Sequence, residues 1–152
     1  MATIVRTNSS SPDFRLLVKL LDDDLYRRYG AVQSQYDKFN IIDSLDTVVI
    51  ANVGGEAVGC GCFKQYDKET VEMKRMFVKP EHRGMGIATQ VLIELEHWAV
   101  ERGFSRAVLE TGEKNPEAIR LYMQHGYRQI EKYGQYVDFE LSLCYAKDLT
   151  AG

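Results

Sequence analysis

Residues 71–90 read VEMKRMFVKPEHRGMGIATQ, and this stretch contains a strand, a turn with two glycines and the beginning of a helix. The apolar-rich run that starts at Val71 predicts a strand that ends before Pro80, and a helix is predicted to begin after Gly86. Glycines at such a turn allow backbone conformations that other residues rarely adopt. The first amides of a helix lack acceptors within the helix, and the helix dipole adds partial positive charge there. The turn is therefore predicted to hold a phosphorylated ligand.

The spacing of this turn excludes two common phosphate-binding motifs. A P-loop requires a lysine directly after its last glycine, and Ile87 stands there. A dinucleotide fingerprint requires Gly or Ala three residues after Gly86, and that position is Thr89. Residues 83–88 read RGMGIA, which fits the pattern Arg-x-x-Gly-x-Gly/Ala.

A second motif follows downstream. The helix after the turn has one apolar face and is predicted to end at Gly103. A short apolar strand, 107–109, then leads to the segment NPEAIRLYMQHGY, residues 115–127. Asn115 is predicted to cap a helix whose first position is Pro116.

The two motifs, in this order, resemble the GNAT acetyltransferase superfamily, and the resemblance covers roughly residues 46–147. It implies an α/β (α+β) fold with a mostly antiparallel mixed sheet of six or seven strands, flanked by four helices. It also implies a V-shaped split between the fourth and fifth strands.

The remaining elements are predicted from local patterns. These are a strand at 3–6, a helix from Phe14 to about Tyr29, a second short helix at 32–39, a hairpin around Gly54 and Gly55, and a pair of closing strands. In the second closing strand, residues 137–145, apolar and polar residues alternate, and residues 127–133 precede it.

Length and composition favour one cytoplasmic domain over residues 1–152. The chain has no 18-residue apolar run and no signal-peptide pattern at its start, so no membrane association is expected. Its three cysteines are predicted to be free thiols, with Cys60 and Cys62 buried and not holding a metal. The net charge of −3 and the lack of a basic run argue against nucleic acid as a partner, and a homodimer is compatible with the sequence.

The resemblance implies acetyl-CoA as co-substrate and assigns residues to it. The residues implied are Met76, Phe77 and Val78 along the pantetheine arm, Arg83, Gly84, Met85, Gly86, Ile87 and Ala88 around the pyrophosphate, and Asn115 and Tyr122 near the arm and the sulfur. Many members of the superfamily carry Lys two residues after the tyrosine, whereas this chain has Gln124, so Arg120 or Lys114 is the alternative cation.

The resemblance also implies two catalytic residues. Tyr122 is placed to protonate the departing thiolate, since a phenol of pKa about 10 can donate to a thiolate of pKa about 8.5. Glu72 matches a carboxylate used as the base in some members. The alternatives are core packing for Tyr122, and an ordinary strand charge paired with Lys74 for Glu72.

The acceptor is predicted to be the primary amine of a small molecule, attacking acetyl-CoA directly in a ternary complex. The superfamily binds its acceptor between the first two helices and the loop joining the last two strands. Aromatic and polar residues gather there in this sequence, and they are Tyr29, Gln33, Tyr36, Tyr133 and Tyr136. A protein or peptide amine, and a module that binds acyl-CoA without turnover, stay as alternatives.

Overall fold

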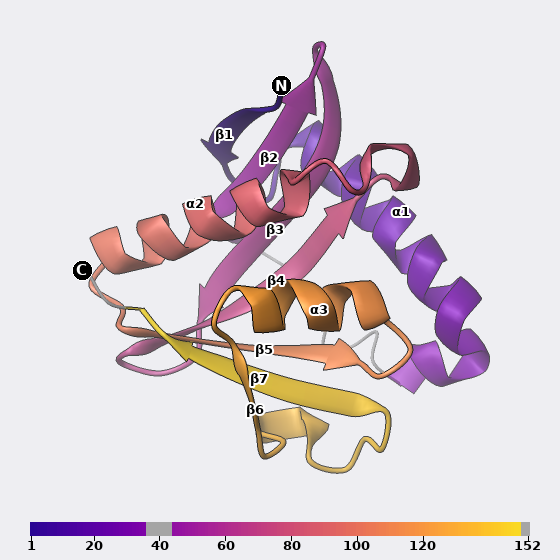
Figure 1. Ribbon diagram of the computed structural model, residues 1–152, viewed down its shortest axis with the longest axis vertical. Helices are drawn as coiled ribbons and strands as arrows, with labels where there is room; N and C mark the ends of the chain where they lie inside the picture. The colour runs from indigo at the N-terminus through magenta and orange to yellow at the C-terminus, as the bar shows by residue number, and fades with distance from the viewer. Residues whose placement is uncertain (36–43, 150–152) are drawn as a thin grey trace.

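A seven-stranded sheet forms the centre of the molecule, as the computed structural model shows for residues 1–35 and 44–149 (Figure 1). Its strand order is β1-β2-β3-β4-β5-β7-β6, and every neighbouring pair is antiparallel except β4 and β5. The strands are β1 Thr3–Thr7, β2 Val48–Val53, β3 Glu56–Gln65, β4 Thr70–Val78, β5 Arg106–Gly112, β6 Arg128–Ile130 and β7 Ser142–Asp148.

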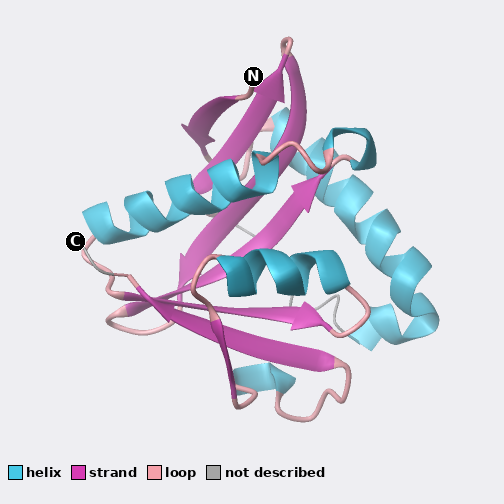
Figure 2. Ribbon diagram, in the orientation of Figure 1, coloured by secondary structure: helices cyan, strands magenta, loops and turns pink. Residues whose placement is uncertain are grey.

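Helices cover both faces of this sheet (Figure 2). Helix α1 (Pro12–Tyr29) lies on one face and buries Phe14, Leu17 and Leu21 against β2, β3 and β4. Helices α2 (Ile87–Glu101) and α3 (Pro116–Gln124) lie on the other face, over the larger apolar core. Residues from both faces of β4 are buried, so the strand lies at the centre of the molecule.

Local signals in the sequence explain where these elements begin and end. The Ser11 side chain accepts a hydrogen bond from the Phe14 amide at the start of α1, and Asn115 caps α3 by accepting from the Ala118 amide, as predicted. Gly54 and Gly55 have φ angles of 57° and 83°, which confirms the predicted hairpin turn between β2 and β3.

Strands β4 and β5 pair only at one end and then diverge. Their parallel pairing covers Thr70 to Glu72 against Arg106 to Val108. Strand β4 has a bulge where one extra residue lies opposite the Cys60–Cys62 stretch of β3. Arg75 lies in this bulge, and its φ of 59° is the one positive value among the described non-glycine residues. The predicted split between the fourth and fifth strands is confirmed (Figure 1). Past Glu72, no strand among the described residues pairs with the β5-facing edge of β4.

The structure corrects the predicted number of helices. The described residues form three α-helices instead of four, and the second predicted helix is a 3-10 helix at Gly30–Gln35 as far as the structure describes it. Residues 36–39 of that prediction lie outside the described part of the chain.

The prediction that the second closing strand begins at residue 137 was also wrong. Strand β7 begins at Ser142, and Val137 is 58% exposed. Backbone hydrogen bonds close turns there, from the Phe139 amide to the Tyr136 carbonyl and from the Ser142 amide to the Phe139 carbonyl. The alternating pattern of 137–141 therefore belongs to a turn whose carbonyls bond locally, in part to Lys132.

The three cysteines are buried and reduced. Burial raises the pKa of the Cys60 thiol, and raises that of Cys62 to about 12, so both act as small apolar residues. Among the described residues, no group of three or more His, Cys, Asp or Glu side chains could hold a metal ion. No described helix is both long and apolar enough to cross a membrane.

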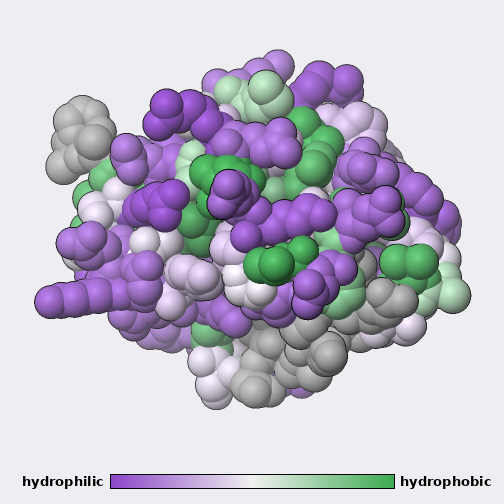
Figure 3. Space-filling view, turned by 90° about the horizontal axis from the view of Figure 1, so that it is seen from below, coloured by the Kyte–Doolittle hydropathy of each residue, from purple (hydrophilic) through white to green (hydrophobic). Residues whose placement is uncertain are grey.

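One face of the molecule is shown in Figure 3. Hydrophobic residues on it form separate patches among hydrophilic ones. Scattered apolar residues of this kind are usual on protein surfaces and need no special role.

Candidate active site

Two cavities meet where β4 and β5 diverge. The larger, about 300 Å³, lies between the end of β4, the start of α2 and helix α3. The smaller, about 120 Å³, lies against α1 and the 3-10 helix that follows it. The residues that line both cavities are Leu21, Met76, Asn115, Ala118 and Tyr122.

The glycine turn opens onto the larger cavity. Gly84 and Gly86 have φ angles of 80° and 79°, and a Cβ atom built on either one would meet nothing within 4 Å. Gly86 is the N-cap of α2, and no side chain caps this end of the helix. Donor amides, a positive helix end and free space thus occur together, which fits a phosphate group.

Most residues assigned to acetyl-CoA line this larger cavity. They are Met76, Phe77, Val78, Arg83, Gly84, Gly86, Ile87, Ala88, Asn115 and Tyr122. Met85 is not among the lining residues, and its side chain is 60% exposed. Arg120 and Gln124 of α3 also line the cavity.

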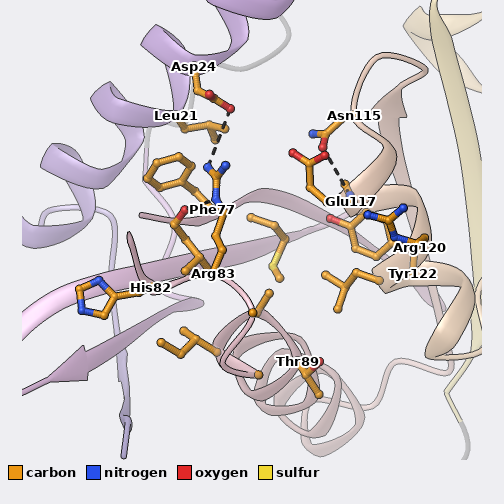
Figure 4. A pocket seen from close by; sticks show the side chains of 18 of the residues that line it. Leu21, Asp24, Phe77, His82, Arg83, Thr89, Asn115, Glu117, Arg120 and Tyr122 are labelled. Atoms are coloured by element: carbon orange, nitrogen blue, oxygen red, sulfur yellow. Dashed lines mark hydrogen bonds and ion pairs between the residues drawn. The ribbon is translucent and has the colours of Figure 1, made fainter. Parts of the chain in front are cut away.

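Arg83 is held at the mouth of the larger cavity (Figure 4). Its Nε donates to the Val78 carbonyl at 2.8 Å, and its guanidinium carbon lies 5.5 Å from the centre of the Phe77 ring. One guanidinium nitrogen lies 4.0 Å from Asp24 Oδ2 of α1. The arginine is thus fixed by backbone and ring contacts, while its distal nitrogens stay near the opening.

Ion pairs link α1 to α3 across the same mouth. Arg28 of α1 pairs with Asp24 in its own helix and with Glu117 at the start of α3, and it donates to the Lys114 carbonyl at 3.2 Å. The hydrogen bond to Glu117 is the main reason why the pKa of Arg28 is raised. Sequence reasoning missed this contact because Arg28 and Glu117 are remote in the chain.

Tyr122 is buried between the two cavities. Its side chain comes from α3, it is 6% exposed, and no described residue hydrogen-bonds to its hydroxyl. Burial, and then the charge of Glu110, raise the pKa of the phenol. The hydroxyl therefore stays protonated at neutral pH, and it is a weaker acid than the unperturbed phenol assumed from the sequence.

Glu110 is a carboxyl group that sequence reasoning missed. It lies on β5, lines the smaller cavity and accepts a hydrogen bond of 2.7 Å from the Ser142 hydroxyl of β7. Burial raises the pKa of Glu110 to about 7, while the Ser142 hydrogen bond and the Lys74 charge oppose that rise. The one signal in the sequence that could have indicated Glu110 as a site residue was its position at the end of an apolar strand, shortly before Asn115.

Glu72, the other carboxylate considered, does not line either cavity. It is 2% exposed, and one oxygen accepts a hydrogen bond of 2.8 Å from the Tyr133 hydroxyl. Its other oxygen lies 4.0 Å from the ammonium groups of both Lys64 and Lys74. Glu72 thus belongs to a buried group of charges that includes Lys74, and of these two residues only Lys74 lines the smaller cavity.

The residues predicted for the acceptor fall into two sets. Tyr29 and Gln33 line the smaller cavity. Tyr133 and Tyr136 do not, and they contact Glu72 and Lys74 instead. Tyr36 lies outside the described residues.

Tyr29 fastens the end of α1 to the loop after β5. Its hydroxyl accepts a hydrogen bond of 3.0 Å from the Lys114 amide, and a Cβ atom on Gly112 would lie 1.8 Å from that hydroxyl. A Gly112→Ala substitution is therefore expected to displace the Tyr29 ring and raise the KM of the acceptor several-fold, with little change in acetyl-CoA affinity. Steady-state kinetics on Tyr29→Ala, Gly112→Ala and the double variant check this. The proposed clash requires that Gly112→Ala adds little once Tyr29 is alanine.

The sequence pattern of the Acetyltransferase (GNAT) family matches residues 14–127. The chain belongs to the GNAT family of acetyltransferases. It is 33% identical over 120 residues to an uncharacterized N-acetyltransferase of Archaeoglobus fulgidus. The aligned residues cover 75% of this chain and 81% of that protein.

Solved structures agree with this GNAT assignment. The structure of a protein described as an acyl-CoA N-acyltransferase from Klebsiella pneumoniae has a TM-score of 0.81 and 30% identity, and covers 99% of each chain. A GNAT acetyltransferase from Elizabethkingia anophelis, with acetyl-CoA bound, has a TM-score of 0.70 and covers 97% of this chain and 98% of its own. At 20% identity, that second likeness shows the fold alone. This GNAT protein is thus an acyl-CoA-dependent N-acyltransferase.

Proposed function

We propose that this protein transfers an acetyl group from acetyl-CoA to the primary amine of a small molecule by direct attack in a ternary complex. The observation that carries the proposal is the meeting of two cavities at Tyr122. One cavity has the glycine turn and can take the pyrophosphate. The other has a carboxyl group of suitable pKa and can take the amine.

The residues around the larger cavity fit the co-substrate. The amides at Gly86, Ile87 and Ala88, together with Arg83, are proposed to bind the pyrophosphate. The unpaired edge of β4 from Met76 to Val78 is proposed to bond the amide groups of the pantetheine arm, as an added strand would. Acetyl-CoA supplies the acyl group as a thioester.

Glu110 is proposed as the base that prepares the amine. An alkyl ammonium has a pKa near 10.4, so it must lose a proton before the nitrogen can attack. A carboxyl group whose pKa is about 7 is half ionised at neutral pH and can take that proton. Glu72 is proposed to support this site through Lys74, since Glu72 does not line the cavity that Glu110 lines.

Tyr122 is proposed to donate to the departing sulfur. As the new N–C bond forms and the thioester S–C bond breaks, the electron pair and negative charge pass to sulfur, and the protonated phenol supplies the proton. The proton held by Glu110 is released to water. After the N–C bond forms, the nitrogen loses a second proton, which passes to water, and Tyr122 is reprotonated from water. The products are the N-acetylated amine, the free thiol and one proton, so the step balances.

The experiment that tests the function is a thiol-release assay with acetyl-CoA and a panel of small primary amines. Release that depends on an amine, with the N-acetyl product seen by mass spectrometry, is the expected result. Tight binding of acetyl-CoA without turnover of any small amine, peptide or protein would instead make the chain a binding module. Turnover of peptides alone would replace the small-molecule acceptor.

Tyr122→Phe is expected to lower kcat at least ten-fold while acetyl-CoA affinity stays nearly unchanged. The substitution deletes the hydroxyl and keeps the ring packing, so it separates chemistry from core packing. Tyr127→Phe is the matched control, because Tyr127 is also a buried tyrosine, but it donates to Glu96 and lines neither cavity. Full kcat in Tyr122→Phe would make the tyrosine a packing residue.

A further inference from the structure

The smaller cavity has polar groups of opposite charge on two walls. Lys74 and Arg75 of β4 supply the positive wall. Glu110 of β5 supplies the acidic wall, next to Thr111. The two strands diverge here, so the two walls are separated by the opening between them.

Both cations are buried and held from outside the cavity. Arg75 is 7% exposed, and its guanidinium pairs with Asp22 of α1 at 2.6 Å. Lys74 is also 7% exposed and lies 4.0 Å from Glu72. Neither Asp22 nor Glu72 lines the cavity. These carboxylates offset the cost of burying positive charge and keep both cations at the wall.

One buried hydrogen-bond donor at this wall lacks an acceptor. Gln33 lines the cavity and is 5% exposed. The Arg75 Nε atom is buried and has no hydrogen-bond partner in the described part of the chain. Buried polar groups are nearly always hydrogen-bonded, so an exception needs an explanation. A bound ligand whose oxygens accept hydrogen bonds at this wall would explain the exception.

We infer that the acceptor carries a carboxylate beside its primary amine, as a free α-amino acid does. Its amine faces Glu110 and the Tyr122 side of the cavity, and its carboxylate faces Gln33, Lys74 and Arg75. This inference rests on the proposed function, and it names the substrate class of the same site.

A simple alkyl amine fits the cavity less well. It can reach Glu110, but it leaves the Arg75 Nε atom without an acceptor and brings a third cation close to Lys74 and Arg75. A carboxylate offsets both costs, because it accepts from these donors and its hydrogen bonds to charged donors are stronger than neutral ones. A polyamine also lacks a carboxylate, and it would bring more positive charge close to Lys74 and Arg75.

Matched pairs of acceptors test the inference directly. Each pair has an amino acid and the amine left when its carboxylate is removed: alanine and ethylamine, leucine and 3-methylbutylamine, phenylalanine and 2-phenylethylamine. The assay measures thiol release with saturating acetyl-CoA. In the best pair, kcat/KM is expected to be at least ten-fold higher for the amino acid. The amino acid amide, which lacks the negative charge, is expected to behave like the amine.

Gln33→Leu and Lys74→Met locate the carboxylate. Each is expected to raise the KM of the preferred amino acid about ten-fold and to change the KM of its matched amine several-fold less. Since Lys74 is buried, Gln33→Leu keeps the test valid if Lys74→Met fails to fold. An effect on KM that is the same for both members of a pair would show a merely structural role and would overturn the assignment.

The outcomes separate the two proposals. If amines without a carboxylate are turned over as well as or better than their amino acids, the inferred class is wrong and the N-acetyltransferase function stands. If no pair, peptide or protein yields free thiol although acetyl-CoA binds, the proposed function fails and this inference fails with it.

Discussion

Glu110→Gln is expected to lower kcat/KM by about 10²- to 10⁴-fold at pH 7, the range that general acid–base groups contribute. The amide keeps the size of the side chain and its contact with Ser142 but cannot take a proton from the amine. For the wild-type enzyme, kcat/KM should rise with pH through about 7, because the carboxylate forms over that range. The variant should lack this limb of the pH profile.

Two other variants test whether the effect of Glu110→Gln is specific to that carboxyl group. Glu69→Gln changes the net charge equally at an exposed turn and is the matched control. Glu72→Gln compares the two carboxylates, and we expect a smaller loss because Glu72 does not line the cavity. If Glu72→Gln removes the pH limb and Glu110→Gln does not, Glu72 is the base.

Stability gives an independent check on Glu110. A folded-state pKa raised to about 7 means that the folded protein binds this proton more tightly than the unfolded chain does. The contribution of Glu110 to the free energy of unfolding therefore falls as pH rises from about 4.5 to 7. Glu110→Gln should then raise stability, relative to the wild type, more at pH 8 than at pH 5. Denaturant unfolding at the two pH values measures this difference.

Gly86→Asp is expected to reduce acetyl-CoA affinity at least a hundred-fold. The side chain would extend into the free space at the start of α2 and place a negative charge where we expect phosphate. Isothermal titration calorimetry with CoA measures the loss, with circular dichroism to confirm that the variant is folded.

Gly54→Asp is the matched control for Gly86→Asp. Gly54 also has a positive φ, at 57°, and open space around its Cβ position, but it lies in the β2–β3 hairpin and lines neither cavity. The control therefore carries the same charge and a similar backbone strain. Equal CoA affinity in the folded Gly86→Asp variant and the control would move the phosphate site away from this turn.

The glycine turn and the capped start of α3 could be predicted because their causes are local. Gly84 and Gly86 allow left-handed backbone, Asn115 supplies a capping side chain, and Pro116 fits the first turn of a helix. The same holds for the Gly54–Gly55 hairpin. Periodicity failed at 137–141, where alternating residues form a turn whose backbone groups bond to one another and to Lys132.

The sequence by itself determined the family, the order of the elements and the turn that faces the larger cavity, because neighbouring residues set each of these. Only the tertiary structure decided which carboxyl group lines a cavity together with Tyr122. Glu72 and Glu110 both lie on strands at the split, where β4 has a bulge and pairs only briefly with β5. Glu110 lines the cavity there, whereas Glu72 does not and lies 4.0 Å from Lys74. Burial then gives Glu110 its raised pKa, and burial depends on chain segments that are remote in sequence.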